Sequence, residues 1–227
     1  MSNNIGKLSI VATPIGNLED MTYRAVRVLS EVDYVLCEDT RVTGKLLKHY
    51  GIAAKLRRYD AHASEDVHVK ILEDLQSGMH MALVSDAGTP GVSDPGVLLV
   101  TRAREAGVRV DAIAGASAVT AAVSIAGFTG NQFSFLGFAP QKKGRETFFA
   151  SLLDFKHPVV FFESTHRIIK TLTALGEHAP IAKLYIGREL TKMHEEMLVG
   201  TAADIVTTLE AEPVRQKGEF VLIIDNR

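Results

Sequence analysis

The stretch VSDAGTPGVSDPG runs from Val84 to Gly96 and continues the apolar run of Met81–Leu83. It contains three glycines, two prolines and two aspartates. A short apolar run that ends in such turn residues is typical of a buried strand. Glycine has no Cβ and proline presets a turn, so a loop of this composition lets its backbone approach a ligand closely. The stretch therefore predicts a buried strand that ends in a binding loop.

Strand-like runs alternate with helix-like periodicity along the whole chain. The predicted strands are residues 8–13, 34–38, 81–85, 108–113, 133–138, 159–163, 183–188 and 219–224. The first predicted helix has Met21, Ala25, Val28, Leu29 and Val32 on one face, and the others are residues 43–50, 64–76, 95–105, 116–125, 145–153, 165–175 and 202–209. This alternation predicts an α/β fold whose sheets are parallel in large part and covered by helices. A division near Gly115 gives two α/β lobes, residues 1–115 and 116–227, with a cleft between them.

Three loops follow predicted strands and are rich in turn residues. They are residues 14–20, 86–96 and 115–118. In open α/β sheets, ligands bind beyond the carboxyl ends of the strands, so these loops predict a pocket for a small polar ligand. The chain has no G-x-G-x-x-G after its first strand, no G-x-x-x-x-G-K-[ST] and no H-E-x-x-H. These absences argue against a dinucleotide Rossmann site, a P-loop and a zincin centre, and we expect no metal.

Composition narrows the class of protein further. The chain has 227 residues, a formal net charge of −2 and 46% hydrophobic residues. The near-neutral charge argues against a generic nucleic-acid coat, which would be strongly basic. Its single cysteine, Cys37, lies in an apolar run and is expected to be a small buried residue. We find no signal-peptide pattern and no apolar run long enough to span a membrane, and we expect a cytoplasmic protein.

Six motifs occur in a characteristic order. They are ATPIGNLEDMTYRA (12–25), CEDTR (37–41), SDAGTPGVSDPG (85–96), FESTHR (162–167), RELTKMHEE (188–196) and KGEFVLII (217–224). Over essentially the whole chain they closely resemble the 16S rRNA cytidine 2′-O-methyltransferases of the tetrapyrrole methylase superfamily. The resemblance implies a class III methyltransferase fold, S-adenosylmethionine as the methyl donor and a homodimer. It also implies that the acceptor is a cytidine 2′-hydroxyl of 16S rRNA in the small ribosomal subunit.

The resemblance also assigns cofactor contacts, largely through backbone, to the three loops and to one aromatic residue. The residues implied are Pro14, Asp86, Ala87, Gly88, Thr89, Ser117, Ala118 and Phe162. A bulky side chain at Gly88 would then intrude on the cofactor.

A ribose hydroxyl is a poor nucleophile, so a base or an electrostatic partner should assist removal of its proton. The candidate polar residues are Glu38, Asp39, Arg41, Glu163, His166, Arg188, Glu189 and Lys192. Asp39 and Glu163 are the leading candidates for the base, and Arg41 is a candidate catalytic cation. The alternative is that these residues form an ion-pair network between the two lobes that positions loops.

RNA binding requires cations, and two segments supply them. Residues 41–58 carry six basic and no acidic residues, beginning with Arg41. A second basic group comprises Lys142, Lys143 and Arg145, which Arg167 could join. Phosphate contacts there would position RNA without reading its sequence. The alternative is a solvated charged face.

Two other functions are considered. A tetrapyrrole C-methyltransferase would share the fold, but such enzymes typically have a G-x-G-P-G-D first loop, where this chain reads TPIGNLEDMT. A nonenzymatic S-adenosylmethionine-binding or RNA-binding module is disfavoured by the polar motifs.

Overall fold

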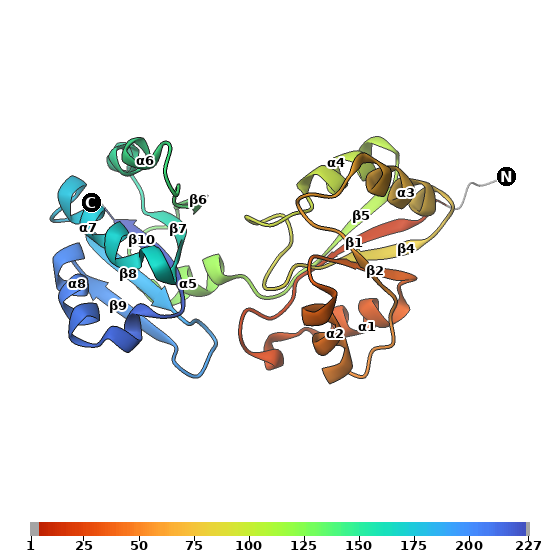
Figure 1. The fold of residues 1–227 in the computed structure, drawn as a ribbon, viewed down its shortest axis with the longest axis horizontal. Helices are drawn as coiled ribbons and strands as arrows, with labels where there is room; N and C mark the ends of the chain where they lie inside the picture. Colours follow the sequence, from red (N-terminus) through yellow and green to blue (C-terminus); the bar gives the residue numbers. More distant parts are fainter. Residues whose placement is uncertain (1–4, 226–227) are drawn as a thin grey trace. The chain divides into compact units, whose positions relative to one another are not determined.

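A computed structural model describes residues 5–225, which divide between Ser117 and Ala118 into two compact units (Figure 1). Each unit contains its own five-stranded sheet. The division predicted near Gly115 lies in the same loop, which joins the last strand of the first sheet to the first helix of the second unit.

The first unit is a parallel α/β structure. Its strands are β1 (Lys7–Val11), β2 (Tyr34–Cys37), β3 (Leu56–Arg58), β4 (His80–Leu83) and β5 (Arg109–Ile113), in the order β3-β2-β4-β1-β5. Every pair of neighbouring strands is parallel. Its helices are η1 (Leu18–Asp20), α1 (Tyr23–Glu31), α2 (Thr40–His49), α3 (Glu65–Gln76) and α4 (Val97–Glu105). Strand β3 was not predicted, because its three residues include two arginines and show no apolar run.

Helices cover both faces of this sheet. Leu29 of α1 and Leu47 of α2 pack with Val35 in one apolar cluster. Leu75 of α3 and Leu99 of α4 pack in another. A sheet buried on both faces is the expected arrangement for parallel strands joined by helices. Figure 1 shows α3 and α4 side by side at the top of the first unit. The helices cover the faces of the sheet, and the loops that follow the strands lie at the edge formed by the carboxyl ends of the strands.

The second unit has a mixed sheet. Its strands are β6 (Ser134–Phe138), β7 (Val159–Ser164), β8 (Lys183–Arg188), β9 (Glu196–Gly200) and β10 (Glu219–Asp225), in the order β6-β7-β10-β8-β9. Only β6 and β7 pair in parallel, and the other three pairings are antiparallel. The expectation of largely parallel sheets is therefore correct for the first unit and wrong for the second. The unpredicted β9 forms a hairpin with β8.

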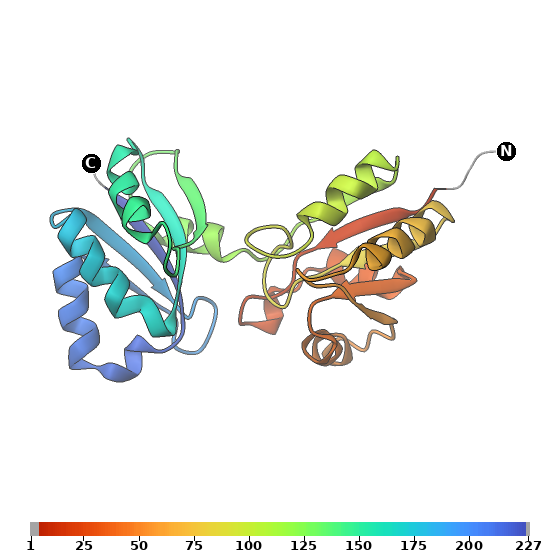
Figure 2. The same ribbon diagram turned by 45° about the horizontal axis from the view of Figure 1, so that its top comes forward.

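The helices of the second unit are α5 (Ala118–Ala126), α6 (Arg145–Ser151), η2 (Leu152–Asp154), η3 (Thr165–Arg167), α7 (Ile168–His178), α8 (Ala202–Ala211) and η4 (Pro213–Gln216). Phe149, Leu172 and Ile205 bring α6, α7 and α8 onto one core with Phe161 of β7. Helix α8 begins with a capping box, in which Thr201 and Asp204 each accept a hydrogen bond from the other's backbone N–H. Figure 2 shows α7 and α8 side by side. No helix in residues 5–225 has the length and apolar character needed to cross a bilayer.

Candidate active site

The three predicted binding loops meet at one edge of the first sheet. Strands β4, β1 and β5 are adjacent and parallel, so their carboxyl ends lie together. Thr13 and Gly88 exchange two backbone hydrogen bonds, of 2.9 and 3.0 Å. The Thr89 hydroxyl donates to the carbonyl of Ala116 at 3.1 Å. Hydrogen bonds therefore join the first loop to the second and the second to the third.

The buried hydroxyl groups of Thr13 and Ser85 form hydrogen bonds to the backbone at the start of the second loop. Thr13 Oγ1 donates to the Ser85 carbonyl at 3.0 Å, and Ser85 Oγ donates to the Ala87 carbonyl at 3.1 Å. Neither residue was predicted from the sequence to have a role at the site. A polar residue directly after an apolar strand, at the start of a glycine-rich loop, is the signal that would have identified both.

Gly88 is required by the loop itself. Its φ of +82° lies in the left-handed region, and a Cβ added there would lie 3.3 Å from Ile15 Cγ2. Its N–H and carbonyl are both engaged with Thr13. A larger side chain here would meet Ile15 and strain the backbone by itself, and the expectation that it also intrudes on the cofactor stays a prediction. Gly115 is similarly constrained, since a Cβ there would lie 2.9 Å from Ala12 Cβ.

The predicted cofactor contacts divide between the two units. Six of them, Pro14, Asp86, Ala87, Gly88, Thr89 and Ser117, lie in the loops at this edge. Asp86 and Ala87 are exposed at the turn, whereas Gly88 is buried beneath it. Ala118 begins α5, and Phe162 lies in β7, where its ring contacts those of Phe135 and Phe138. An exposed turn above a glycine whose Cβ position is closed fits a ligand held by backbone groups.

Acidic side chains approach the same edge from β2 and β4. Glu38 follows β2, and Asp86 and Asp94 follow β4. Partial burial, together with the charges of Asp94 and Asp86, raises the pKa of Glu38. Burial also raises the pKa of Asp94. A carboxylate with a raised pKa is a better proton acceptor, so Glu38 is the candidate base that this edge supplies.

Asp39 does not suit the predicted role of base. Its carboxylate caps α2 by accepting the Arg41 backbone N–H at 2.8 Å, and it also receives the Arg41 guanidinium at 2.6 Å. These interactions hold the pKa of Asp39 well below its usual range. A carboxylate so stabilised as an anion is a weak base. Arg41 is exposed, and the structure pairs it with Asp39.

Glu163 is the second predicted base, and its side chain is fully buried. Its oxygens receive Arg167 at 2.7 Å, the Ser164 N–H at 2.7 Å and the Thr171 hydroxyl at 2.5 Å, and Arg145 lies at 3.6 Å. Both carboxylate oxygens are therefore occupied. Glu163 therefore belongs to an ion-pair network inside the second unit, whereas the alternative considered for these residues was a network between the lobes.

The structure separates the arginines of the two basic segments from their lysines. In residues 41–58 the three arginines pair with aspartates outside the segment: Arg41 with Asp39, Arg57 with Asp74 and Arg58 with Asp60. The three lysines of this segment, Lys45, Lys48 and Lys55, are exposed, as are Lys142 and Lys143, and none of the five forms an ion pair within residues 5–225. These lysines therefore remain free to meet phosphates in both segments.

Arg145 and Arg167 differ from Lys142 and Lys143. Arg145 is only 6% exposed, and it donates to the Pro140 carbonyl and to Thr171 Oγ1. The side chain of Arg167 is 19% exposed and is held by Glu163. A phosphate contact requires an accessible guanidinium, so the prediction for Arg145 needs correction.

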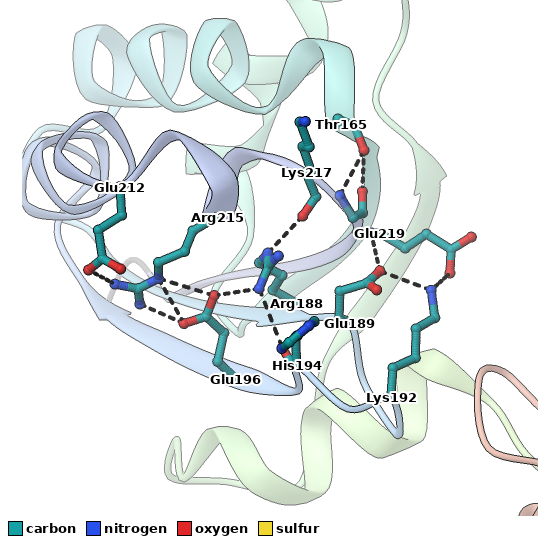
Figure 3. A network of polar contacts seen from close by, with 11 residues as sticks. Thr165, Arg188, Glu189, Lys192, His194, Glu196, Glu212, Arg215, Lys217 and Glu219 are labelled. Carbon is teal, nitrogen blue, oxygen red and sulfur yellow. Dashed lines mark hydrogen bonds and ion pairs between the residues drawn. The ribbon is translucent and has the colours of Figure 1, made fainter.

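The RELTKMHEE motif forms a polar network around the β8–β9 hairpin (Figure 3). Glu196 receives Arg188 at 2.9 Å and Arg215 at 2.5 Å. Lys192 bridges Glu189 and Glu219, at 2.9 Å from each. Glu189 and Thr191 have positive φ values of 49° and 67°. The network thus holds a strained loop, a structural role for residues considered as catalytic candidates.

His, Cys, Asp and Glu side chains in residues 5–225 do not gather in groups of three or more that could hold a metal ion.

Comparison with known proteins identifies the family. Residues 7–206 match the model of the Tetrapyrrole (Corrin/Porphyrin) Methylases. The chain is 47% identical over 220 residues to "Ribosomal RNA small subunit methyltransferase I" of Neisseria meningitidis, covering 96% of this chain and 76% of that protein. It is 40% identical over 223 residues to the protein of the same name from Thermotoga maritima, covering 98% of this chain and 100% of that protein.

Solved structures share the fold at low sequence identity. The methyltransferase CobJ superposes with a TM-score of 0.70 at 20% identity, covering 97% of this chain and 94% of that chain. A diphthine synthase superposes with a TM-score of 0.72 at 14% identity, covering 96% of this chain and 90% of that chain. The sequence match, the shared fold and the loop-built edge agree, and the chain belongs to the tetrapyrrole (corrin/porphyrin) methylase family.

Proposed function

We propose that this protein transfers a methyl group from S-adenosylmethionine to a cytidine 2′-hydroxyl of 16S rRNA in the small ribosomal subunit. The relatives at 40–47% identity carry the name of a small-subunit rRNA methyltransferase. The structural observation that supports the proposal is the edge of the first sheet, where hydrogen bonds tie three loops around an exposed turn at Asp86 and Ala87.

S-adenosylmethionine supplies a methyl group activated by a sulfonium centre. We assign its binding to Pro14, to the 86–89 turn and to Ser117, with Ala118 and Phe162 as the predicted contacts from the second unit. The hydroxyl groups of Thr13 and Ser85 orient this turn through their hydrogen bonds to the carbonyls of Ser85 and Ala87. Holding the reacting groups in line contributes up to ~7–11 kcal/mol in well-oriented systems, so rigid loops are the main requirement.

Glu38 is our candidate for the group that takes the ribose proton. The pKa of Glu38 is raised, so Glu38 takes up a proton more readily than Asp39, whose negative charge is stabilised by Arg41. This assignment replaces Asp39 and Glu163. We assign the phosphate contacts to Lys142 and Lys143, the exposed lysines of the loop that precedes α6.

The test is a tritiated-methyl assay with three acceptors: small ribosomal subunits lacking the modification, free 16S rRNA and a tetrapyrrole. We expect label in the subunits, located on a single cytidine ribose by mapping of 2′-O-methyl sites. Labelling of the tetrapyrrole alone would identify a C-methyltransferase. Absence of label in all three, with S-adenosylmethionine still bound, would support a binding module.

We further propose that the protein acts in the cytoplasm as a homodimer, as the family resemblance implies. Sedimentation equilibrium of the purified chain should give twice the 24.7 kDa mass of the chain. A monomer at the concentration used in the activity assay would contradict this part of the proposal.

A further inference from the structure

Glu163 sits at the centre of a buried polar network in the second unit. It is in β7, and its partners come from two other elements: Arg145 begins α6, and Thr171 lies in α7. Arg167, in the short helix between β7 and α7, completes the network. A buried carboxylate is stable only when it is paired and hydrogen-bonded, and here two guanidinium groups meet that requirement.

Both arginines also donate to the same short piece of backbone. Arg167 donates to the carbonyl of Ala139 at 3.1 Å, and Arg145 donates to the carbonyl of Pro140 at 3.0 Å. The Ala139 N–H in turn donates to the carbonyl of Phe162, the residue before Glu163. The chain leaving β6 is thus fastened to β7 through the partners of Glu163.

The basic loop begins directly after this fastened backbone. Residues 141–144 are all exposed and include Lys142 and Lys143, and Gly144 has the left-handed φ of +82° that turns the chain into α6. Arg145 ends the loop in the buried network. Both ends of the four-residue loop are therefore anchored by the arginines that Glu163 holds, while its lysines remain in solvent.

We propose that Glu163 is a positioning residue for RNA docking, which acts through Arg145 and Arg167 to hold Lys142 and Lys143 in the geometry that meets rRNA phosphates. The inference rests on the proposed function and goes beyond it. The two arginines are suited to this role because the planar guanidinium can donate to a carboxylate and a carbonyl at the same time. A lysine ammonium lacks this fixed fork.

This role differs from that of a general base in what it predicts for kinetics. A base acts on the reacting hydroxyl, so its loss lowers kcat. A group that orders a docking loop affects binding of the subunit, so its loss raises KM or Kd with little change in kcat. The isosteric substitution Glu163→Gln removes the charge and leaves the shape, so it separates the two roles.

The experiment is a double-mutant cycle. The proteins are the wild type, Glu163→Gln, the pair Lys142→Ala with Lys143→Ala, and the combination of all three. Each is assayed with small ribosomal subunits that lack the modification, and S-adenosylmethionine affinity is measured by calorimetry. Glu177→Gln, an exposed carboxylate near the end of α7, is the matched control.

We expect Glu163→Gln to raise KM for the subunits about tenfold in the wild-type background, with kcat and cofactor affinity little changed. In the background without the two lysines, the same substitution should raise KM by less than about twofold, because residues that act through one another are not additive. Glu177→Gln should leave all values unchanged.

An equal effect of Glu163→Gln in both backgrounds would overturn the proposal, because a general structural or catalytic role does not depend on the lysines. If Glu163→Gln does not fold by circular dichroism, the cycle is run with Arg167→Lys, which keeps the charge beside Glu163 but loses the fork to Ala139. A wild-type protein that does not methylate subunits would refute the proposed function. Additivity in a wild-type enzyme that does methylate them would refute this inference alone.

Discussion

The hydroxyl of Thr89 donates to the carbonyl of Ala116 at 3.1 Å, and this hydrogen bond joins two loops that are separated by a strand and a helix in the sequence. Together with the backbone bridge between Thr13 and Gly88, it makes one unit of the three loops that follow β1, β4 and β5. The three loops at the candidate cofactor edge are therefore linked to one another by hydrogen bonds and do not form three independent turns.

Thr89→Val removes the hydroxyl and keeps the shape of the side chain. We expect the affinity for S-adenosylmethionine to fall about 5–10-fold, because loss of one hydrogen bond typically costs ~1 kcal/mol and here it frees the third loop. Thr89→Ser should restore binding. Thr101→Val removes a hydroxyl bonded to the Val97 carbonyl in α4 and is the matched control. Titration calorimetry measures the affinity of each variant for S-adenosylmethionine. An unchanged affinity in Thr89→Val would show that the link between the second and third loops does not contribute to cofactor binding.

Gly88→Ala should destabilise the first unit by ~1–2 kcal/mol through its backbone alone, since φ is +82°. Gly107→Ala has a comparable φ of +75° but open space around its Cβ. The difference in thermal midpoint between the two variants isolates the contact of the new Cβ with Ile15. We expect Gly88→Ala to be the less stable protein by scanning calorimetry. Equal midpoints would show that the close approach to Ile15 costs nothing.

Glu38→Gln tests the base and its pH dependence. The pKa of Glu38 is raised in the folded state, so at neutral pH its charge disfavours folding, and below its unfolded pKa the group is protonated and this penalty is absent. We expect Glu38→Gln to raise the thermal midpoint at pH 7, with no gain near pH 4. Methyl transfer should fall by ~10²–10⁴-fold, the usual contribution of general base catalysis. Asp39→Asn, which keeps a capping side chain, should retain most of the activity. The reverse ranking would restore Asp39 as the base.

Removing Lys142 and Lys143 together should weaken binding of the small subunit and reduce its dependence on salt. Each lost phosphate contact makes the slope of log affinity against log salt shallower by ~0.7–0.9, so the pair should change it by ~1.4–1.8. Lys70 and Lys156 are exposed lysines elsewhere, and their double replacement removes the same charge. Filter binding across a salt series compares the two proteins. Identical slopes would show that the 141–144 loop is a solvated face.

Two carboxylates pair with Arg215, and they should contribute unequally to stability. The Glu196 side chain is 22% exposed and also pairs with Arg188, whereas that of Glu212 is 59% exposed. We expect Glu196→Gln to lower the free energy of unfolding by ~1.5–3 kcal/mol and Glu212→Gln by ~0–1 kcal/mol. Urea unfolding followed by circular dichroism provides the values. In 0.5 M salt the smaller effect should vanish first, since exposed pairs are screened.

Much of the first unit could be predicted from the sequence because its signals are local. The apolar run before VSDAGTPGVSDPG marks a strand, and glycine at 88 marks a turn that only glycine adopts without strain. In the second unit the strands were predicted where they are long, but their directions were not. The residue pattern of a buried strand is the same in a parallel and an antiparallel pairing, so β10 between β7 and β8 could not be read from it. The cleft predicted between the lobes stays a prediction.

By itself, the sequence determined the α/β class, the three loops at strand ends and the family, because these depend on residue type, spacing and order. Only the tertiary structure decided which charged residues are available for chemistry. Asp39 and Glu38 are neighbours in the chain, yet Arg41 stabilises the charge of one while burial and Asp94 disfavour that of the other. Arg145 stands two residues after Lys143, yet it is buried against Glu163 while the lysine is in solvent. Arg41 is a local partner of Asp39, but Asp94 and Asp86 lie far from Glu38 in the sequence and Glu163 lies 18 residues from Arg145, so folding has to bring these partners together.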